Sequence, residues 1–143
     1  MTYFDVPSEH SALPNFSPKL SQDSMVESAV KAYKGWADLI IELDRHLRYI
    51  SPDYEVFQVK EKFGGLRYYA NYVPREGETV EQQMVGRQIF NRLIDETCAR
   101  SLHHCYVCGA EGRRWIEETG WIYTACRDHL RNPGRDTYYD ERK

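Results

Sequence analysis

Four soft metal ligands near the C-terminal end most constrain how this chain can fold. Cys105 and Cys108 form a C-x2-C pair, and after seventeen intervening residues Cys126 and His129 form a C-x2-H pair. Paired thiolate and imidazole ligands at this spacing are typical of a structural zinc site, whose tetrahedral shell they complete. The sequence therefore predicts one structural Zn²⁺ held by Cys105, Cys108, Cys126 and His129.

The residues between the two ligand pairs predict the local structure around the metal. The segment RRWIEETGWIYTA can form a hairpin about its ETG, which places Cys126 at the end of the second strand. His129 then lies one turn into a short helix, CRDHLR. A knuckle, a hairpin and a ligand-bearing helix follow one another in a treble-clef module, so we expect a treble-clef-like or zinc-ribbon zinc finger.

The cysteines could instead form two unrelated thiol pairs in a core, ligate iron or an iron–sulfur cluster, or act as a redox CxxC motif. The histidine ligand disfavours an iron–sulfur cluster, and a redox motif needs a βαβ setting that this pattern lacks. A catalytic zinc keeps one coordination position for water, whereas here four protein ligands fill the shell. We therefore expect no enzymatic activity, and we assign His103 and His104 to a helix C-terminus.

Charge and composition restrict the partner and the compartment. The 143 residues include 19 Lys and Arg against 22 Asp and Glu, and this net charge of −3 argues against general coating of nucleic acid. The longest apolar run, ADLII, is far below the ~20 residues of a spanning helix, and the N-terminus has no secretory pattern. We expect a cytoplasmic protein, without a membrane partner, whose reduced thiols bind metal.

An α+β body is predicted ahead of the zinc module. Residues 1–22 are polar and interrupted by prolines, which predicts an extended or disordered arm. Residues 23–102 form the body, which has two helices and a β-hairpin. Its first helix carries an apolar stripe from Ala29 to Ile50, with a bend at Gly35.

The rest of the body and the zinc module follow directly. Thr79 caps a second helix, which runs to about Leu102 and has an apolar side that includes Val85. Residues 103–135 are then the zinc module, packed on the body. Residues 136–143 are short and charged, and we expect them to form a frayed tail.

The pair Gly64-Gly65 lies between two strand-like runs and predicts a two-residue hairpin turn, because both glycines accept positive φ. In that register three pairs form one mostly apolar face: Phe63 with Leu66, Val59 with Ala70, and Phe57 with Tyr72. The opposite, solvent-facing side carries basic and aromatic side chains, namely Lys60, Lys62, Arg67 and Tyr69.

Together, the hairpin and the zinc motif resemble a family of uncharacterised small zinc-binding proteins from phages and bacteria. The family pattern KEKFG-x-LR-x-Y, C-x-x-CG and GW-x-x-T-x-C-x-x-H matches at Lys60–Tyr69, Cys105–Gly109 and Gly120–His129. The resemblance covers roughly residues 55–130. It implies a zinc-binding fold and phage ancestry, with a host enzyme or defence complex as a plausible target, and it brings no assigned activity.

Two classes of function fit these features. Small aromatic-rich proteins without a catalytic constellation act by covering a surface, so the first is binding of another protein. The alternative is nucleic-acid binding by a basic hairpin face and an Arg-rich zinc module, through Lys60, Lys62, Arg67, Tyr69, Arg113 and Arg114. The balanced charge of the C-terminal part favours the protein partner.

Overall fold

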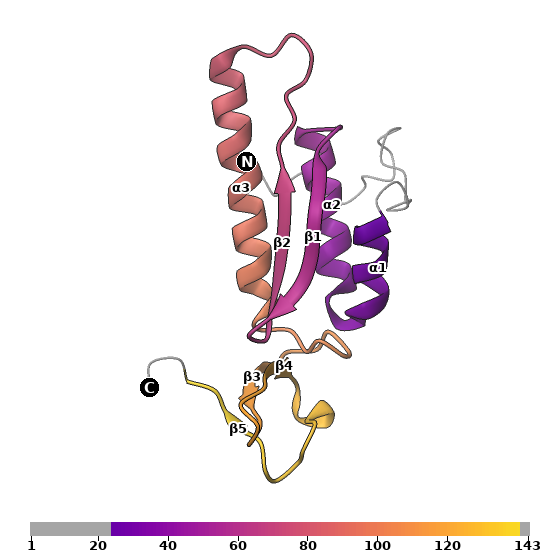
Figure 1. Ribbon diagram of the computed structural model, residues 1–143, viewed down its shortest axis with the longest axis vertical. Helices are drawn as coiled ribbons and strands as arrows, with labels where there is room; N and C mark the ends of the chain where they lie inside the picture. The colour runs from indigo at the N-terminus through magenta and orange to yellow at the C-terminus, as the bar shows by residue number, and fades with distance from the viewer. Residues whose placement is uncertain (1–23, 141–143) are drawn as a thin grey trace.

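The computed structural model describes residues 24–140, so the predicted arm of residues 1–22 lies outside the described residues. Three helices pack on a β-hairpin, and a second small sheet lies at one end of this body (Figure 1). The body elements are α1 (Ser24–Ala32), η4 (Lys34–Trp36), α2 (Ala37–Ile50), β1 (Glu55–Lys62), β2 (Gly65–Asn71) and α3 (Val80–Ser101). The C-terminal elements are β3 (Arg113–Ile116), β4 (Ile122–Ala125), η5 (Arg127–His129) and β5 (Thr137–Tyr138). This arrangement confirms the α+β class and adds one helix to the two that were predicted.

The predicted first helix is interrupted next to the bend expected at Gly35. Tyr33 leaves helical geometry, with φ −117° and ψ 67°, and a single 3₁₀ turn leads into α2. The Gly35 backbone N–H donates to the carbonyl oxygen of Tyr106 at 2.9 Å, and the Trp36 indole N–H donates to that of His104 at 2.9 Å. The interruption therefore serves to bring this turn against the C-x2-C segment.

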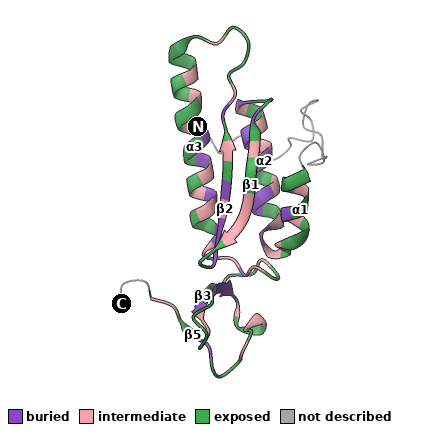
Figure 2. Ribbon diagram, in the orientation of Figure 1, coloured by how far each residue is buried: buried purple, intermediate pink, exposed green. Residues whose placement is uncertain are grey.

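A single apolar core joins the helices to the hairpin. The stripe predicted on the first helix is largely confirmed, because Trp36, Ile40, Leu43 and Leu47 are all buried. They meet side chains of β2 and α3, among them Leu66, Tyr68, Phe90 and Leu93. Figure 2 shows that the first turns of α3 are mostly exposed. Val85, predicted on the apolar side, is 55% exposed because these turns extend past the end of the hairpin.

The hairpin turn differs from the prediction by one residue. The turn residues are Phe63 and Gly64, with φ of 52° and 81°, and Lys62 pairs with Gly65. Gly65 is the first residue of β2, and a Cβ there would be 2.9 Å from the Cδ2 atom of Leu102. This glycine therefore permits close packing on α3, and the positive φ falls on Phe63.

The shifted turn changes which residues of the two strands pair, but it leaves the same side chains on each face of the hairpin. Each β1 residue next to the turn pairs with a β2 residue two positions earlier than predicted, so that Lys60 faces Arg67. Side chains alternate with a period of two along a strand, so a shift of two preserves the inward and outward sets. The predicted burial of Phe57 and Phe63 is nevertheless wrong, since they are 52% and 58% exposed. Phe57 lies at an irregularity between Val56 and Gln58, and Phe63 lies in the turn itself.

The C-terminal sheet has the strand order β4–β3–β5. Its β3–β4 hairpin is the one predicted from the sequence, whereas β5 was expected to belong to a frayed tail. Tyr138 of β5 lies against Trp115 with ring centroids 4.3 Å apart, and the buried carboxylate of Asp136 accepts a hydrogen bond from Tyr123. These contacts order residues 136–140 against the module.

A buried polar network links α2 to the hairpin. The Asp44 carboxylate accepts hydrogen bonds from the Tyr54 hydroxyl and from Arg48 Nε, the latter at 3.0 Å. Tyr54 and Tyr68 are joined through their hydroxyl oxygens at 2.5 Å. Burial, followed by the nearby Tyr68 and Asp44, raises the pKa of Tyr54 well above its ordinary value. These groups satisfy one another, which is how buried polar groups avoid a desolvation penalty.

None of the helices within residues 24–140 combines the length and the apolar character needed to cross a membrane.

Candidate metal centre and the adjoining groove

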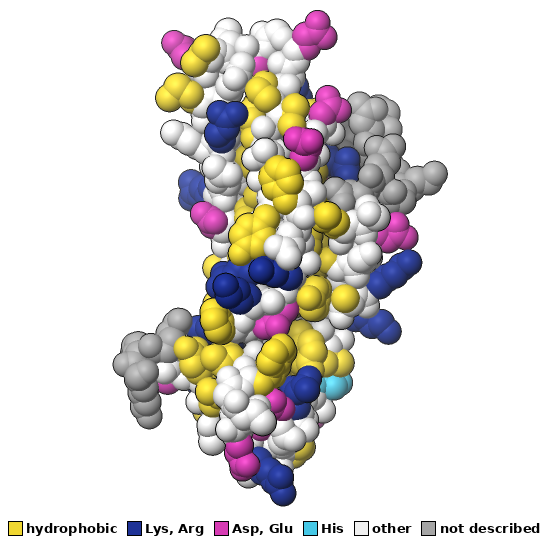
Figure 3. Space-filling view, viewed as in Figure 1, with side chains coloured by type: hydrophobic (Ala, Val, Ile, Leu, Met, Phe, Trp, Pro, Cys, Tyr) yellow, Lys and Arg dark blue, Asp and Glu magenta, His cyan; other side chains and the backbone are white. Residues whose placement is uncertain are grey.

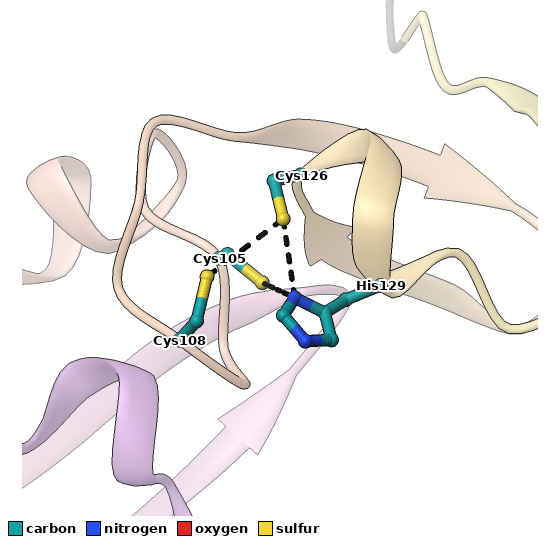
Figure 4. A group of neighbouring side chains, drawn as sticks. All are labelled: Cys105, Cys108, Cys126 and His129. Carbon is teal, nitrogen blue, oxygen red and sulfur yellow. Dashed lines mark hydrogen bonds between the residues drawn. The ribbon is translucent and has the colours of Figure 1, made fainter.

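The four predicted ligands converge on one point. The ligand atoms of Cys105, Cys108, Cys126 and His129 all lie within 4.8 Å of one another (Figure 4). The Sγ atoms of Cys108 and Cys126 are 3.7 Å apart, and His129 Nδ1 lies 3.2 Å from Cys126 Sγ and 3.7 Å from Cys105 Sγ. A Cys₃His group of this kind could hold a metal ion, and no fifth protein ligand is needed to complete a tetrahedron.

The backbone of the C-x2-C segment folds into a tight knuckle. The N–H of Gly109 donates to the carbonyl oxygen of Cys105 at 2.8 Å, and Gly109 has a φ of 81°. The N–H of Val107 points to Cys105 Sγ at 3.4 Å. Burial raises the pKa of the Cys105 thiol, but backbone N–H groups of Cys126, Cys108 and Val107 outweigh it and lower the pKa to about 7. Backbone N–H groups from both ligand pairs thus stabilise a thiolate at Cys105, which is the form that binds metal.

The second ligand pair is presented by the end of the β3–β4 hairpin. Cys126 follows β4 directly, and the N–H of His129 donates to its carbonyl oxygen at 3.1 Å. The helix predicted over CRDHLR is only the 3₁₀ turn η5, because Leu130 already has extended geometry with ψ 135°. Cys105 is buried and Cys108 is exposed, so the centre lies at the surface of the module.

Side chains of the hairpin, α3 and β3 line a groove that contains none of the four candidate ligands. Its volume is about 590 Å³. Four of the six residues predicted to contact a partner lie in it, namely Lys62, Arg67, Tyr69 and Arg114. Its α3 wall is formed mainly by Ile94, Cys98, Ala99 and Leu102, with Asp95 as an acidic member. Burial raises the pKa of the Cys98 thiol.

The other two predicted contact residues lie differently. Lys60 lies over the ring of Tyr69, with its Nζ 5.7 Å from the centroid, and so stays next to the groove. The guanidinium of Arg113 lies 3.3 Å from the ring centroid of Tyr138. Arg113 therefore contacts β5, and the sequence could not indicate this because the tail was not expected to form a strand.

Phe63 is a groove residue that the sequence pattern placed in the core. It lines the groove beside Lys62, whose Nζ lies 5.5 Å from the ring centroid. A correct placement of the hairpin turn would have predicted that Phe63 is exposed. A two-residue hairpin loop directs its central side chains away from the sheet core, so a turn at Phe63-Gly64 exposes the ring.

No family model, curated protein or solved structure matches this chain.

Proposed function

We propose that this protein is a non-enzymatic, zinc-stabilised binding protein whose groove between the hairpin and α3 recognises another protein. The metal maintains the C-terminal module, and the module contributes Arg114 to the groove. The need for reduced thiols makes the cytoplasm the expected compartment.

Zinc is the metal that best suits this donor set. A tetrahedral ion with metal–sulfur bonds of about 2.3 Å has sulfur–sulfur edges of about 3.8 Å. The 3.7 Å between Cys108 Sγ and Cys126 Sγ fits that edge. Three thiolates and an imidazole are soft ligands, which disfavours Mg²⁺ and Ca²⁺. With all four positions taken, the ion has a structural role in a module that is treble-clef-like in the order of its parts.

The conformation of Phe63 is the observation that carries the binding function. Its φ of 52° is in the left-handed region, where a bulky side chain costs about 1–2 kcal/mol relative to the usual geometry. The ring remains 58% exposed, so burial offsets little of this cost. Strained, exposed aromatic residues are expected where function requires them, and aromatic anchors dominate protein interfaces.

The charges around the groove favour a protein with an acidic surface. Within the described residues, Lys60, Lys62 and Arg67 form no ion pair with a carboxylate. Figure 3 shows a compact group of Lys and Arg side chains over the hairpin, with hydrophobic side chains above and below it. A compact cationic spot among exposed apolar groups fits a protein interface better than the extended cationic track that follows a nucleic-acid strand.

The test replaces Phe63 by Asn, since Asn-Gly is a favoured sequence for this turn. Phe63→Asn should stabilise the fold by about 1 kcal/mol in urea denaturation because it relieves the left-handed strain. In affinity capture from host extract, the partner should be retained by the parent and lost from Phe63→Asn and Tyr69→Ala.

Phe57→Thr is the matched control, because it removes a similarly exposed ring that lies outside the groove. It should retain the partner. Phe63→Asn capturing the same protein as the parent, at the same salt, would contradict the proposed interface.

Nucleic acid is the second candidate, favoured by the contacts of Lys60 with Tyr69 and of Lys62 with Phe63, which combine a cation with a stacking ring. The deciding measurement is a salt titration with single- and double-stranded oligonucleotides. Sub-micromolar binding at ~150 mM salt that is lost on reversing Lys60, Lys62 and Arg67 to Glu would replace the protein partner by nucleic acid.

A further inference from the structure

A small cavity lies at the seam between the body and the C-terminal module, and its lining shares no residue with the groove. Its volume is about 100 Å³. Its walls are mainly aromatic and come from both units: Tyr33, Trp36, Tyr106, Trp121 and Tyr123. Trp36 and Tyr123 are buried, whereas Trp121 is 50% exposed. This is far below the ~300–1,000 Å³ of drug-sized sites, so it holds one small group and not a whole ligand.

A carboxylate completes the lining on the side of the hairpin. Glu61 lines the cavity, and its Oε2 atom accepts a hydrogen bond from the Gly64 backbone N–H at 2.7 Å. The Tyr33 hydroxyl accepts a hydrogen bond from the Glu61 backbone N–H at 3.2 Å. Within the described residues no Lys or Arg pairs with the Glu61 carboxylate. Glu61 therefore adds a negative charge to a mainly aromatic lining, and the described part of the chain gives that charge no counter-ion.

Arg131, a cationic residue of the cavity lining, already contacts an aromatic ring of that lining. The guanidinium of Arg131 lies 6.0 Å from the ring centroid of Tyr123, and its Nε donates to Glu117 at 3.1 Å. A cation within about 6 Å of an aromatic centroid is attracted by the negative face of the ring. Arg131 thus brings a cation next to one ring of the cavity lining, and Glu117 offsets its charge.

We propose that the seam cavity binds a methylated ammonium group. Several rings and one carboxylate favour a cation by cation–π attraction, in the same way as the aromatic cages that hold quaternary ammonium groups. A bare ammonium would need acceptors for three N–H donors. The hydroxyl oxygens of Tyr33 and Tyr123 and the Glu61 carboxylate each already accept a backbone N–H, which leaves it few acceptors in the cavity. A trimethylammonium head carries its charge without N–H donors, so it avoids this penalty.

The test uses tetramethylammonium, choline and 3,3-dimethylbutan-1-ol, the uncharged isostere of choline, with the zinc-loaded protein. The methyl resonances of the two cations should move upfield on binding because they lie against ring faces. Their dissociation constants should be about tenfold lower than that of the neutral isostere. Equal binding of choline and the isostere would overturn the proposal, since the cavity would then select for shape alone.

Variants locate the site. Trp121→Ala should weaken tetramethylammonium binding about tenfold, and Glu61→Gln several-fold, whereas Arg131→Ala should strengthen it by removing a competing cation. Tyr69→Ala removes an exposed ring of the groove, outside the cavity, and should leave binding unchanged. Thermal denaturation verifies that each variant is folded. Loss of binding in Tyr69→Ala, or none in Trp121→Ala, would place the cation elsewhere and overturn the assignment.

Two arms distinguish the source of the group. A peptide with trimethyllysine that binds more tightly than both free tetramethylammonium and the unmodified peptide identifies a protein side chain as the ligand. Choline binding as tightly as the peptide identifies a small molecule. Because this site does not include Phe63 or Tyr69, its failure would leave the proposed protein-binding groove untouched.

Discussion

Substitution of Gly35 by Ala separates two possible roles of this glycine in the interrupted first helix. If Gly35 were only a weak helical residue, alanine would stabilise the protein by about 0.5–1 kcal/mol. The structure predicts the opposite. A Cβ at Gly35 would lie 1.9 Å from the carbonyl oxygen of Cys105 and 2.5 Å from the carbonyl carbon of Tyr106. Both are backbone atoms of the C-x2-C knuckle, so neither can rotate aside.

The expected loss follows from the contacts that must separate. Forcing a methyl group into a closely packed site costs ~1–3 kcal/mol. Moving the turn away also breaks the hydrogen bonds from Gly35 to Tyr106 and from Trp36 to His104, each worth ~1 kcal/mol. After subtracting ~1 kcal/mol for the better helix propensity of alanine, the free energy of unfolding should fall by about 2–4 kcal/mol. That is a large part of the ~5–15 kcal/mol that stabilises a typical domain.

Urea denaturation of the metal-loaded parent and of Gly35→Ala measures this difference, with tryptophan fluorescence as the signal. Metal release to a chelator should also be faster in Gly35→Ala, because the displaced turn no longer supports the knuckle. Gly77→Ala is the control. Nothing lies within 4 Å of its added Cβ, and its φ of 85° predicts only about 1–2 kcal/mol of backbone strain and unchanged metal release. A Gly35→Ala variant as stable as the parent would refute the close contact.

Three further outcomes are expected. Elemental analysis should find about one zinc per chain. Cys108→Ser should lose the metal and unfold the C-terminal module, because metal binding and folding are coupled. A Cys108→Ser variant that is zinc-loaded and as stable as the parent would contradict the structural role. Tyr138→Ala should lower the free energy of unfolding by about 1–2 kcal/mol by uncovering Trp115, whereas a frayed tail would give no change in the same denaturation assay. Hydrogen bonds from the Tyr72 hydroxyl and the Arg75 backbone N–H lower the pKa of Glu78 in the folded state. The ionised Glu78 therefore stabilises the fold fully above about pH 4.3, the pKa of an unperturbed Glu, and this contribution is lost as the pH falls through the lower folded-state pKa. The difference in stability between parent and Glu78→Gln should therefore close in that acidic range, and a difference independent of pH would contradict this.

The Cys₃His cluster could be predicted from the sequence because metal-ligand chemistry restricts both the residue types and their spacing. Cys105, Cys108, Cys126 and His129 were identified without knowledge of the fold, and the structure brings them together. The start of α3 was predictable for a similar reason. The Thr79 side chain accepts from the Gln82 backbone N–H at 3.1 Å, an interaction that depends only on residues three apart.

The glycines show why other features were not predictable. Gly64 supplies a positive φ, Gly65 permits contact with Leu102, and Gly35 permits contact with the knuckle. Backbone freedom and close approach select the same residue, so a Gly-Gly pair does not reveal which glycine is in the turn. Which glycine lies in the turn depends on contacts with residues that are distant in sequence. The position of the turn in the sequence then determines whether the Phe63 side chain is buried or exposed.

Both candidate binding surfaces depend on the seam between the body and the C-terminal module. The groove takes Arg114 from the module, and the cavity takes Trp121, Tyr123 and Arg131 from it. Polar contacts of the module fix this seam, including the hydrogen bond from the Thr124 hydroxyl to the Gly64 carbonyl oxygen at 2.6 Å. Each such bond contributes only ~1 kcal/mol, and its geometry requires the knuckle and β4 to be held in place. Under the proposed function, a metal ion in the Cys₃His group would act on recognition by positioning the module's share of both candidate sites.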